Sequence, residues 1–280
     1  RPGVGGMDSR AALTAAAEGS LECLILVGCD PLGDVPDADL ARRALAGARR
    51  VIAVYTFLTP SSSQADVVLA AAAYGEKSGT TTNIEGRVTT VSRQITAYGT
   101  SRPDWMIAAD LAAELGGDLG VESADDVLSA MAELNDSYAD ITAEALRTSR
   151  NGVLSHVPTS LDPINPPTVA VPDRNSYDYR LVVSRTLYDA AIGTANSPSL
   201  AGLAVPATVH IHPLDLERVG VADGGSVSII GQRTAVVMIA TADEAILRGT
   251  AWVPFNQPGC AIGDLIDGSA AVTDVRIERL

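Results

Sequence analysis

Residues 65–88 read ADVVLAAAAYGEKSGTTTNIEGRV, and this stretch decides how the front of the chain is interpreted. Its first part, residues 67–71, is a short apolar run typical of a buried strand. Its second part belongs to residues 74–90, where three Gly, five Thr and one Asn disfavour a regular helix. A loop of this length inside a domain is usually functional or disordered. The opposite charges within it favour an ordered loop.

The charged and polar side chains of this loop could hold a ligand or hold the loop itself. Four of them can pair with one another: Glu76, Lys77, Glu85 and Arg87. The sequence leaves open whether Lys77 pairs with Glu85 or points outward. Thr80 and Asn83 supply donors and acceptors for a polar ligand or for the loop's own backbone. The residue types fit a ligand site and a purely structural loop equally well.

Around this stretch, buried strands alternate with helices. Strands are predicted at residues 21–27 and 51–55, and helices at residues 9–19, with Ser9 as cap, and 37–49. This alternation predicts a parallel sheet with right-handed crossovers. Open sheets of this kind bind ligands at the carboxyl ends of their strands, where the loop of residues 74–90 begins.

A helical region and a second kind of domain follow. Residues 103–146 have helical periodicity, with the second and third helices at 123–134 and 136–146. The 11 acidic and no basic side chains of residues 104–144 favour a solvated face over a docking surface for a basic partner. We divide the chain into an α/β domain (1–150), a proline-rich linker (151–176) and a small closed β-barrel (177–280). Its strands are expected at 180–185, 207–212, 226–230, 234–240, 249–253 and 273–279.

Composition excludes several classes of function. With 20 basic and 34 acidic residues, the chain carries a formal charge of −14, which disfavours binding to nucleic acids and to anionic lipid surfaces. No apolar run approaches the roughly 20 residues of a membrane helix. The three cysteines and three histidines lack the spacing of a zinc or iron–sulphur site. No nucleophile elbow or phosphate loop occurs, and we expect no catalytic residue and no metal ligand.

Several motifs resemble one known family. Residues 65–69, 76–80 and 83–87 resemble the signature of the molybdopterin oxidoreductase superfamily, and residues 28–31 resemble its Gly-x-Asn/Asp-Pro turn. Residues 212–227 and 249–254 resemble the molybdopterin-dinucleotide-binding domain, a double-psi β-barrel. The resemblance implies an α/β fold: an incomplete parallel-sheet Rossmann-like domain with extra helices, followed by that barrel. Upstream sequence would complete the sheet, whose edge would be exposed here.

The resemblance also implies where a cofactor would bind. If the ancestral pocket is retained, the residues that contact molybdopterin guanine dinucleotide are Asp30, Lys77, Thr80, Asn83 and Arg185. Two segments, residues 188–191 and 255–257, depart from the pattern of cofactor-binding members. These departures fit a subunit that keeps the fold as a scaffold without the cofactor.

Within the superfamily, residues 27–45 and 184–189 look most like the large iron–sulphur subunits of bacterial NADH-quinone oxidoreductases, complex I. This likeness implies a structural and assembly segment in electron transfer from NADH to quinone. It implies no cofactor in this segment, with the iron–sulphur clusters in an upstream part of a longer chain, an interpretation favoured by Arg1 as the first residue. The implied partners are the other subunits of the complex I peripheral arm. The implied location is cytoplasmic, on the inner face of the plasma membrane without insertion.

Two other functions remain open. The chain could be the cofactor-binding half of a molybdopterin-dinucleotide enzyme of the formate dehydrogenase or nitrate reductase type, or a barrel used only as an interaction module. Stoichiometric molybdenum or tungsten would distinguish the first of these from a scaffold.

Overall fold

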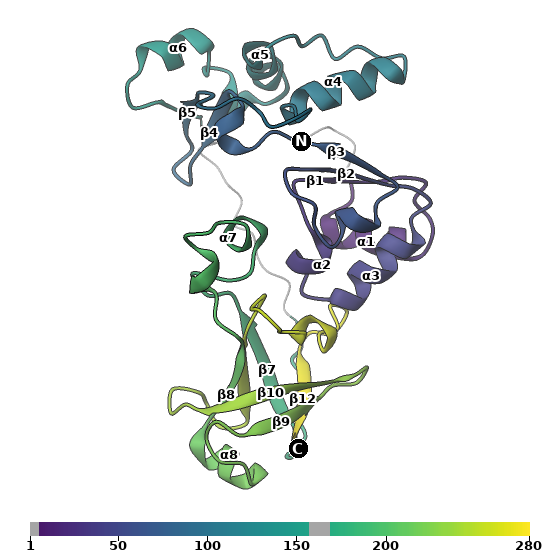
Figure 1. Ribbon diagram of the computed structural model, residues 1–280, viewed down its shortest axis with the longest axis vertical. Coiled ribbons are helices and arrows are strands. Elements are labelled where there is room, and N and C mark those ends of the chain that lie inside the picture. Colours follow the sequence, from purple (N-terminus) through teal and green to yellow (C-terminus); the bar gives the residue numbers. More distant parts are fainter. Residues whose placement is uncertain (1–5, 157–168) are drawn as a thin grey trace.

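A parallel sheet, an antiparallel sheet and a closed barrel follow one another along the chain (Figure 1). The computed structural model describes residues 6–156 and 169–280. Much of the predicted linker, residues 157–168, lies outside the described residues. None of the described helices is both long and apolar enough to cross a bilayer.

The parallel sheet has the order β1-β2-β3, with β1 at Leu24–Val27, β2 at Val51–Tyr55 and β3 at Val67–Ala70. Helices α1 (Ser9–Ala17) and α3 (Ala38–Gly47) pack against one face through buried aliphatic side chains. Helix α4 (Asp104–Glu114) covers part of the other face, where Ile107 meets Val54. These elements confirm the predicted parallel sheet. The cap of α1 is Asp8 and not Ser9, because the Asp8 carboxylate accepts from the Ala11 amide.

One edge of this sheet is open, as expected. Among the described strands, β1 pairs with β2 alone. The side chains of Ile25 and Val27 on β1, which point to the face opposite α1 and α3, are 52% and 58% exposed. The outer side of β3 is partly covered, because Arg102 bridges to Ala71.

The prediction of a loop over residues 74–90 is wrong, because most of these residues form a β-hairpin. After a 3₁₀ turn (η2, Tyr74–Glu76), β4 (Gly79–Thr82) pairs antiparallel with β5 (Arg87–Val91). Threonine and valine are β-branched and favour extended backbone, which explains the hairpin. Asn83 closes its turn, since its side-chain oxygen accepts from the amides of Glu85 and Arg87, both at 2.9 Å.

Helices and one short strand cover this hairpin. Helix α5 (Ala124–Leu134), the 3₁₀ turn η3 (Asp136–Tyr138) and α6 (Ala143–Thr148) surround the fully buried Val88 of β5. The single helix expected at 136–146 is therefore two pieces, since Thr142 caps a new helix through the Ala145 amide. Strand β6 (Val153–Leu154) pairs with β5, so the start of the predicted linker belongs to this sheet.

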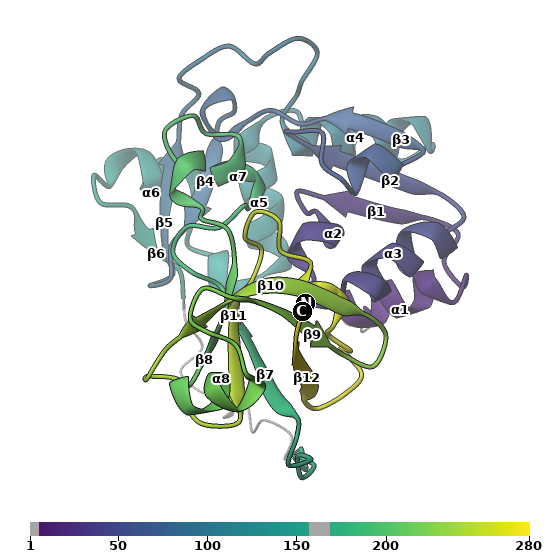
Figure 2. The ribbon, with the colours of Figure 1, turned by 60° about the horizontal axis from the view of Figure 1, so that its bottom comes forward.

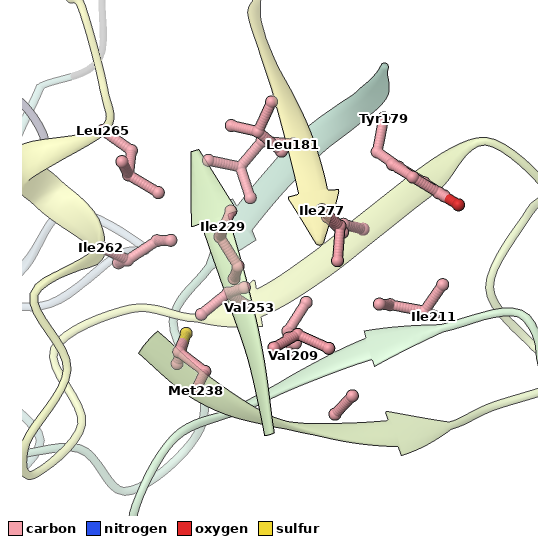
Figure 3. Packing of buried hydrophobic residues seen from close by; sticks show 14 of the residues in the cluster. Tyr179, Leu181, Val209, Ile211, Ile229, Met238, Val253, Ile262, Leu265 and Ile277 are labelled. Carbon is pink, nitrogen blue, oxygen red and sulfur yellow. The ribbon is translucent and has the colours of Figure 1, made fainter. Parts of the chain in front are cut away.

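The second half is a closed barrel of six strands in the order β10-β8-β11-β7-β12-β9. Their bounds are Tyr179–Ser184 (β7), Thr208–Ile211 (β8), Ser226–Ile230 (β9), Ala235–Ala242 (β10), Thr250–Pro254 (β11) and Thr273–Arg279 (β12). Two parallel pairs, β7 with β11 and β8 with β10, are joined by antiparallel pairs, which confirms the predicted double-psi barrel. Alternate side chains fill its interior, among them Val209, Ile211 and Ile229 (Figure 3).

Short helices and 3₁₀ turns complete the fold. They are α2 (Pro31–Asp34), η1 (Ser62–Gln64), α7 (Ile192–Ala195), η4 (Ala201–Leu203), α8 (Pro213–Val219) and η5 (Ile262–Asp264). Helix α8 lies at one end of the barrel (Figure 2). The 3₁₀ turn η5 contacts α3 of the front half.

Polar contacts join the two halves at α3. Arg233, in the turn between β9 and β10, donates to the carboxylates of Asp37 and Asp39 and to the Ile266 carbonyl. The same Asp37 accepts from the Gly268 amide of the barrel at 2.9 Å. These contacts fix the barrel against the start of α3.

Candidate cofactor site

The turn after β1 is built around a buried carboxylate, Asp30. The turn begins at Gly28, whose φ of +60° suits glycine. Asp30 is 2% exposed, and its Oδ1 accepts from the Ser61 amide at 3.0 Å. Ser61 Oγ in turn accepts from the Leu32 amide at 3.0 Å. Asp30 therefore connects the turn after β1 to the segment after β2 through its Oδ1 atom.

The carboxyl edge of this sheet carries negative charge. Burial raises the pKa of the Cys29 thiol, and the nearby Asp34 carboxylate raises it further. The pKa of Tyr55, at the end of β2, is raised first by burial and then by the charges of Asp34 and Asp30. Both shifts oppose an additional negative charge at this edge.

The barrel contributes an arginine to the same region. Arg185 follows β7, and its Nε lies 3.2 Å from Asp189 Oδ2. Its Nη2 lies 3.7 Å from Oδ1 of Asp34 in the front half, and its guanidinium carbon lies 5.7 Å from the centre of the Phe255 ring. The carboxylates of Asp34 and Asp189 thus flank the arginine that the sequence pointed to as a cofactor contact.

The loop behind Arg185 is braced by Gln257, which sequence reasoning noted only as a departure from the family pattern. Gln257 is 4% exposed, and its Nε2 donates to Thr186 Oγ1 at 2.7 Å and to the Tyr188 carbonyl at 3.0 Å. Its Oε1 is buried without a hydrogen-bond partner among the described residues. The preceding Asn256 has φ of +55°, an uncommon conformation for a residue other than glycine.

Two of the predicted cofactor residues, Lys77 and Thr80, line a different cavity, beside α4. Lys77 forms an ion pair with Asp104 at the start of α4, and not with Glu85. Lys77 and Thr80 line a cavity of about 270 Å³ together with Trp105. The pairing expected within the hairpin is present only between Glu85 and Arg87, at 3.5 Å.

The five predicted cofactor residues therefore lie in three places. Asp30 and Arg185 are brought together through Asp34, Lys77 and Thr80 share the cavity beside α4, and Asn83 closes the hairpin turn. Their role in binding stays a prediction. Over residues 6–156 and 169–280, no cluster of three or more His, Cys, Asp or Glu side chains could hold a metal ion.

Two family models each match a part of this chain. Residues 4–114 match the family model described as Molybdopterin oxidoreductase, and residues 179–276 match the Molydopterin dinucleotide binding domain. These two matches show a molybdopterin oxidoreductase domain and a molydopterin dinucleotide binding domain in the chain. Acetylene hydratase from Pelobacter acetylenicus has the same fold, with a TM-score of 0.73 at 13% sequence identity over 96% of this chain and 46% of that one.

The curated relatives that this chain is similar to have diverse names. An NADPH-Fe(3+) oxidoreductase subunit alpha of Geobacter sulfurreducens is 27% identical over 99% of this chain and 32% of its own length. An assimilatory nitrate reductase catalytic subunit of Bacillus subtilis is 27% identical over 89% of this chain and 39% of its own. A subunit of an NADH-quinone oxidoreductase of Rhizobium meliloti is 27% identical over 93% and 30%. The chain spans about a third of the length of these relatives.

The residues around Arg185 do not fit a pyrophosphate group. A bound anion needs free cations or free amides, but here Asp34 and Asp189 neutralise the arginine. The nearby cavity between the halves, lined by Gly33, Arg42 and Phe255, holds about 240 Å³. Sites for small organic ligands commonly measure roughly 300–1,000 Å³. The fold of the dinucleotide-binding domain is present, and its charge arrangement at this point opposes the nucleotide.

Proposed function

We propose that this chain is a scaffold segment of a redox subunit of the NADH-quinone oxidoreductase type, in which the cofactor fold has a structural task. The observation that carries the proposal is the neutralisation of Arg185 by Asp34 and Asp189. An arginine whose charge is balanced by two nearby carboxylates attracts a further anion only weakly. On this proposal, the chain itself contributes no catalytic residue.

The contacts between the halves support a structural task. Asp37 is 6% exposed and accepts from the Leu40 amide of its own helix and from the Gly268 amide of the barrel. A second ion pair joins Arg42 to Asp264 at 2.6 Å. A buried and multiply bonded group such as Asp37 defines one relative position of two packed parts, and the exposed Arg42–Asp264 pair adds a second contact.

Two of the relatives support the redox assignment by their names, since one belongs to an NADPH-Fe(3+) and the other to an NADH-quinone oxidoreductase. By extension, the segment acts within a multi-subunit enzyme that takes electrons from a reduced nicotinamide nucleotide. Its partners would be the other subunits of the peripheral arm, on the cytoplasmic side of the membrane. The iron–sulphur clusters would belong to other parts of the complex.

The test is the metal and pterin content of the longer native protein, purified without chelators. We expect iron, measured by plasma mass spectrometry, without molybdenum or tungsten and without fluorescent pterin after oxidation. Molybdenum or tungsten at about one atom per chain, together with pterin, would overturn the scaffold proposal.

A second function, the cofactor-binding half of a molybdopterin enzyme, is favoured by one specific observation. The buried Oε1 of Gln257 has no donor among the described residues, and a ligand N–H or O–H would satisfy it. Formate dehydrogenase and nitrate reductase subunits are among the relatives. In this case Asp30, Lys77, Thr80, Asn83 and Arg185 would contact the pterin nucleotide.

Substitutions distinguish this second function from the first. If the cofactor binds here, Lys77→Ala should lower the pterin content of the native protein. Arg93→Ala serves as the matched control, because it removes a cation just beyond the hairpin that does not line the cavity. Equal pterin content in both variants would argue against contact with Lys77.

A further inference from the structure

Strand β3 forms one outer edge of the parallel sheet, beside α4 (Figure 2). The Ala71 amide donates to the Tyr55 carbonyl of β2, so the alternate residues of β3 direct their amides and carbonyls outward. Arg102 covers the end of this edge, where its amide donates to the Ala70 carbonyl at 3.1 Å. Over the described residues, the amide and carbonyl of Val68 and the amide of Ala70 therefore have no hydrogen-bond partner.

Two adjoining cavities follow this unpaired stretch of backbone. The first, of about 490 Å³, lies along Val68 and Ala70. The second, of about 410 Å³, extends to Glu114 at the end of α4. Leu69 and Ile107 line both cavities, so the two form one groove with a partly apolar wall, here called the β3 groove. An extended segment in this groove would lie beside the free backbone groups of β3.

The β3 groove carries a net negative charge. Arg102, the cation that lines both cavities, forms an ion pair with Asp110. Glu114 also lines the groove and forms no ion pair with the described residues. The surrounding residues 104–144 contain 11 acidic and no basic side chains. A second copy of the chain would bring like charge to this place, whereas a basic segment would be attracted to it.

We propose that the β3 groove binds an extended, basic polypeptide segment of another protein, which adds to the sheet as a strand beside β3. The free groups of Val68 and Ala70 pair with the backbone of that segment, and its lysine or arginine side chains approach Glu114. The acidic residues of α4, which the sequence alone favours as a solvated face, thereby gain a partner. The groove involves neither Arg185 nor a cofactor, so binding there is independent of the scaffold function proposed above.

The test measures how a fluorescein-labelled peptide that alternates lysine and valine binds to the 280-residue chain, by fluorescence anisotropy at physiological ionic strength. Val68→Pro removes an outward amide, and proline is tolerated in an edge strand where the amide faces solvent. We expect it to weaken binding at least about fivefold, the effect of one lost hydrogen bond. The matched control, Val68→Thr, keeps the amide and the β-branched shape, and should bind within about twofold of the wild type.

A second pair of variants tests the charge. Glu114→Gln should weaken binding about threefold, as expected for an exposed ion pair. Glu133→Gln removes an equally exposed carboxylate from α5, outside the groove, and should have less than half of that effect. Equal losses for the two variants would show attraction to the net charge of the protein and would overturn the proposed site.

A modified peptide keeps the test decisive even if Val68→Pro does not fold. Methylation of all backbone amides of the peptide leaves its charges and apolar side chains unchanged, and should weaken binding to the wild type at least about fivefold. Equal affinity of the methylated and unmethylated peptides, or no binding of either, overturns strand addition. Dimerisation of the chain that Val68→Pro abolishes, measured by analytical ultracentrifugation, would assign the groove to a second copy and would likewise overturn the proposal.

Discussion

The Nδ1 atom of His210 lies 3.0 Å from Oδ2 of Asp243, and this contact joins β8 to the loop that follows β10. The other carboxylate oxygen accepts from the Ala245 amide at 2.9 Å. On its far side, His210 Nε2 lies 3.2 Å from Thr208 Oγ1, and Trp252 packs edge-on against the imidazole. The outer surface of the barrel thus carries an ordered polar contact whose strength depends on the charge of Asp243.

Asp243→Asn should weaken the barrel in a pH-dependent way. The Ala245 amide, followed by His210, lowers the pKa of Asp243, so ionised Asp243 stabilises the fold above its unfolded pKa of about 3.9. This stabilisation is lost as the pH falls through the lower, folded pKa. The melting temperature of Asp243→Asn should therefore lie below that of the wild type at pH 7, and the gap should close on acidification below about pH 4.

The control for this experiment is Glu244→Gln, which removes the same charge from the next residue. Glu244 makes no side-chain hydrogen bond or ion pair with the described residues. Calorimetric melting curves of both variants over the same pH range provide the comparison. If both variants lowered the melting temperature by the same amount at each pH, then net charge, and not the His210 contact, would determine the pH dependence.

Arg233→Ala should loosen the junction between the halves. It removes donors from Asp37, whose side chain is 8% exposed, and from Asp39. Hydrogen bonds to charged groups contribute about 1.5–3 kcal/mol, and we expect a loss of about that size in the free energy of unfolding. Urea denaturation measures it. Arg43→Ala, which deletes an exposed pair with Asp39, should lose clearly less stability, and similar losses for both variants would contradict the proposed role of Arg233.

Gly152→Ala should disrupt the short strand pair that covers β5. Gly152 has φ of +74°, and a Cβ there would lie 2.3 Å from the Val88 carbonyl oxygen. The backbone conformation alone costs about 1–3 kcal/mol for alanine, and the clash adds to it. Gly99→Ala isolates the first effect, because Gly99 has φ of +58° with no atom within 4 Å of the added carbon. Equal losses in the free energy of unfolding for Gly152→Ala and Gly99→Ala would show that the contact with Val88 adds nothing.

Ile211→Val should measure how well the barrel interior is packed. Ile211 is fully buried in the cluster of Figure 3, and loss of one methylene there costs about 0.5–1.5 kcal/mol. Ile239→Val, on a neighbouring strand with 43% exposure, should change stability by less than about 0.5 kcal/mol. Guanidinium denaturation of both variants tests the difference.

The fold was predictable where local pattern decides the structure. Strands β9 (Ser226–Ile230) and β12 (Thr273–Arg279) have the predicted bounds, since alternating apolar residues between turn signals specify them. The hairpin was missed because glycine and threonine in residues 74–90 were read as loop signals. The β-branched side chains of the same segment favour extended backbone, and the helices that bury Val88 stabilise the resulting hairpin.

The site was predictable only as a set of residues and not as a set of contacts. Motif matching identified Arg185, but Asp34 lies in the other half and its contact with Arg185 exists only after the halves pack. The Lys77 partner was missed for the same reason, since Asp104 belongs to a separate helix. Gln257 drew attention as a departure from the family pattern, and its unpartnered oxygen depends on burial that no sequence motif encodes.

The closure of the barrel has a consequence for how other polypeptides can be recognised. Each of its six strands has two neighbours, so neither edge of any barrel strand is left open. A partner can contact the barrel through side chains and loops, but it cannot extend it by adding a strand. Among the described strands, the outer edge of β1 has no paired neighbour, so a polypeptide that binds by strand addition would find its backbone partners in the front half.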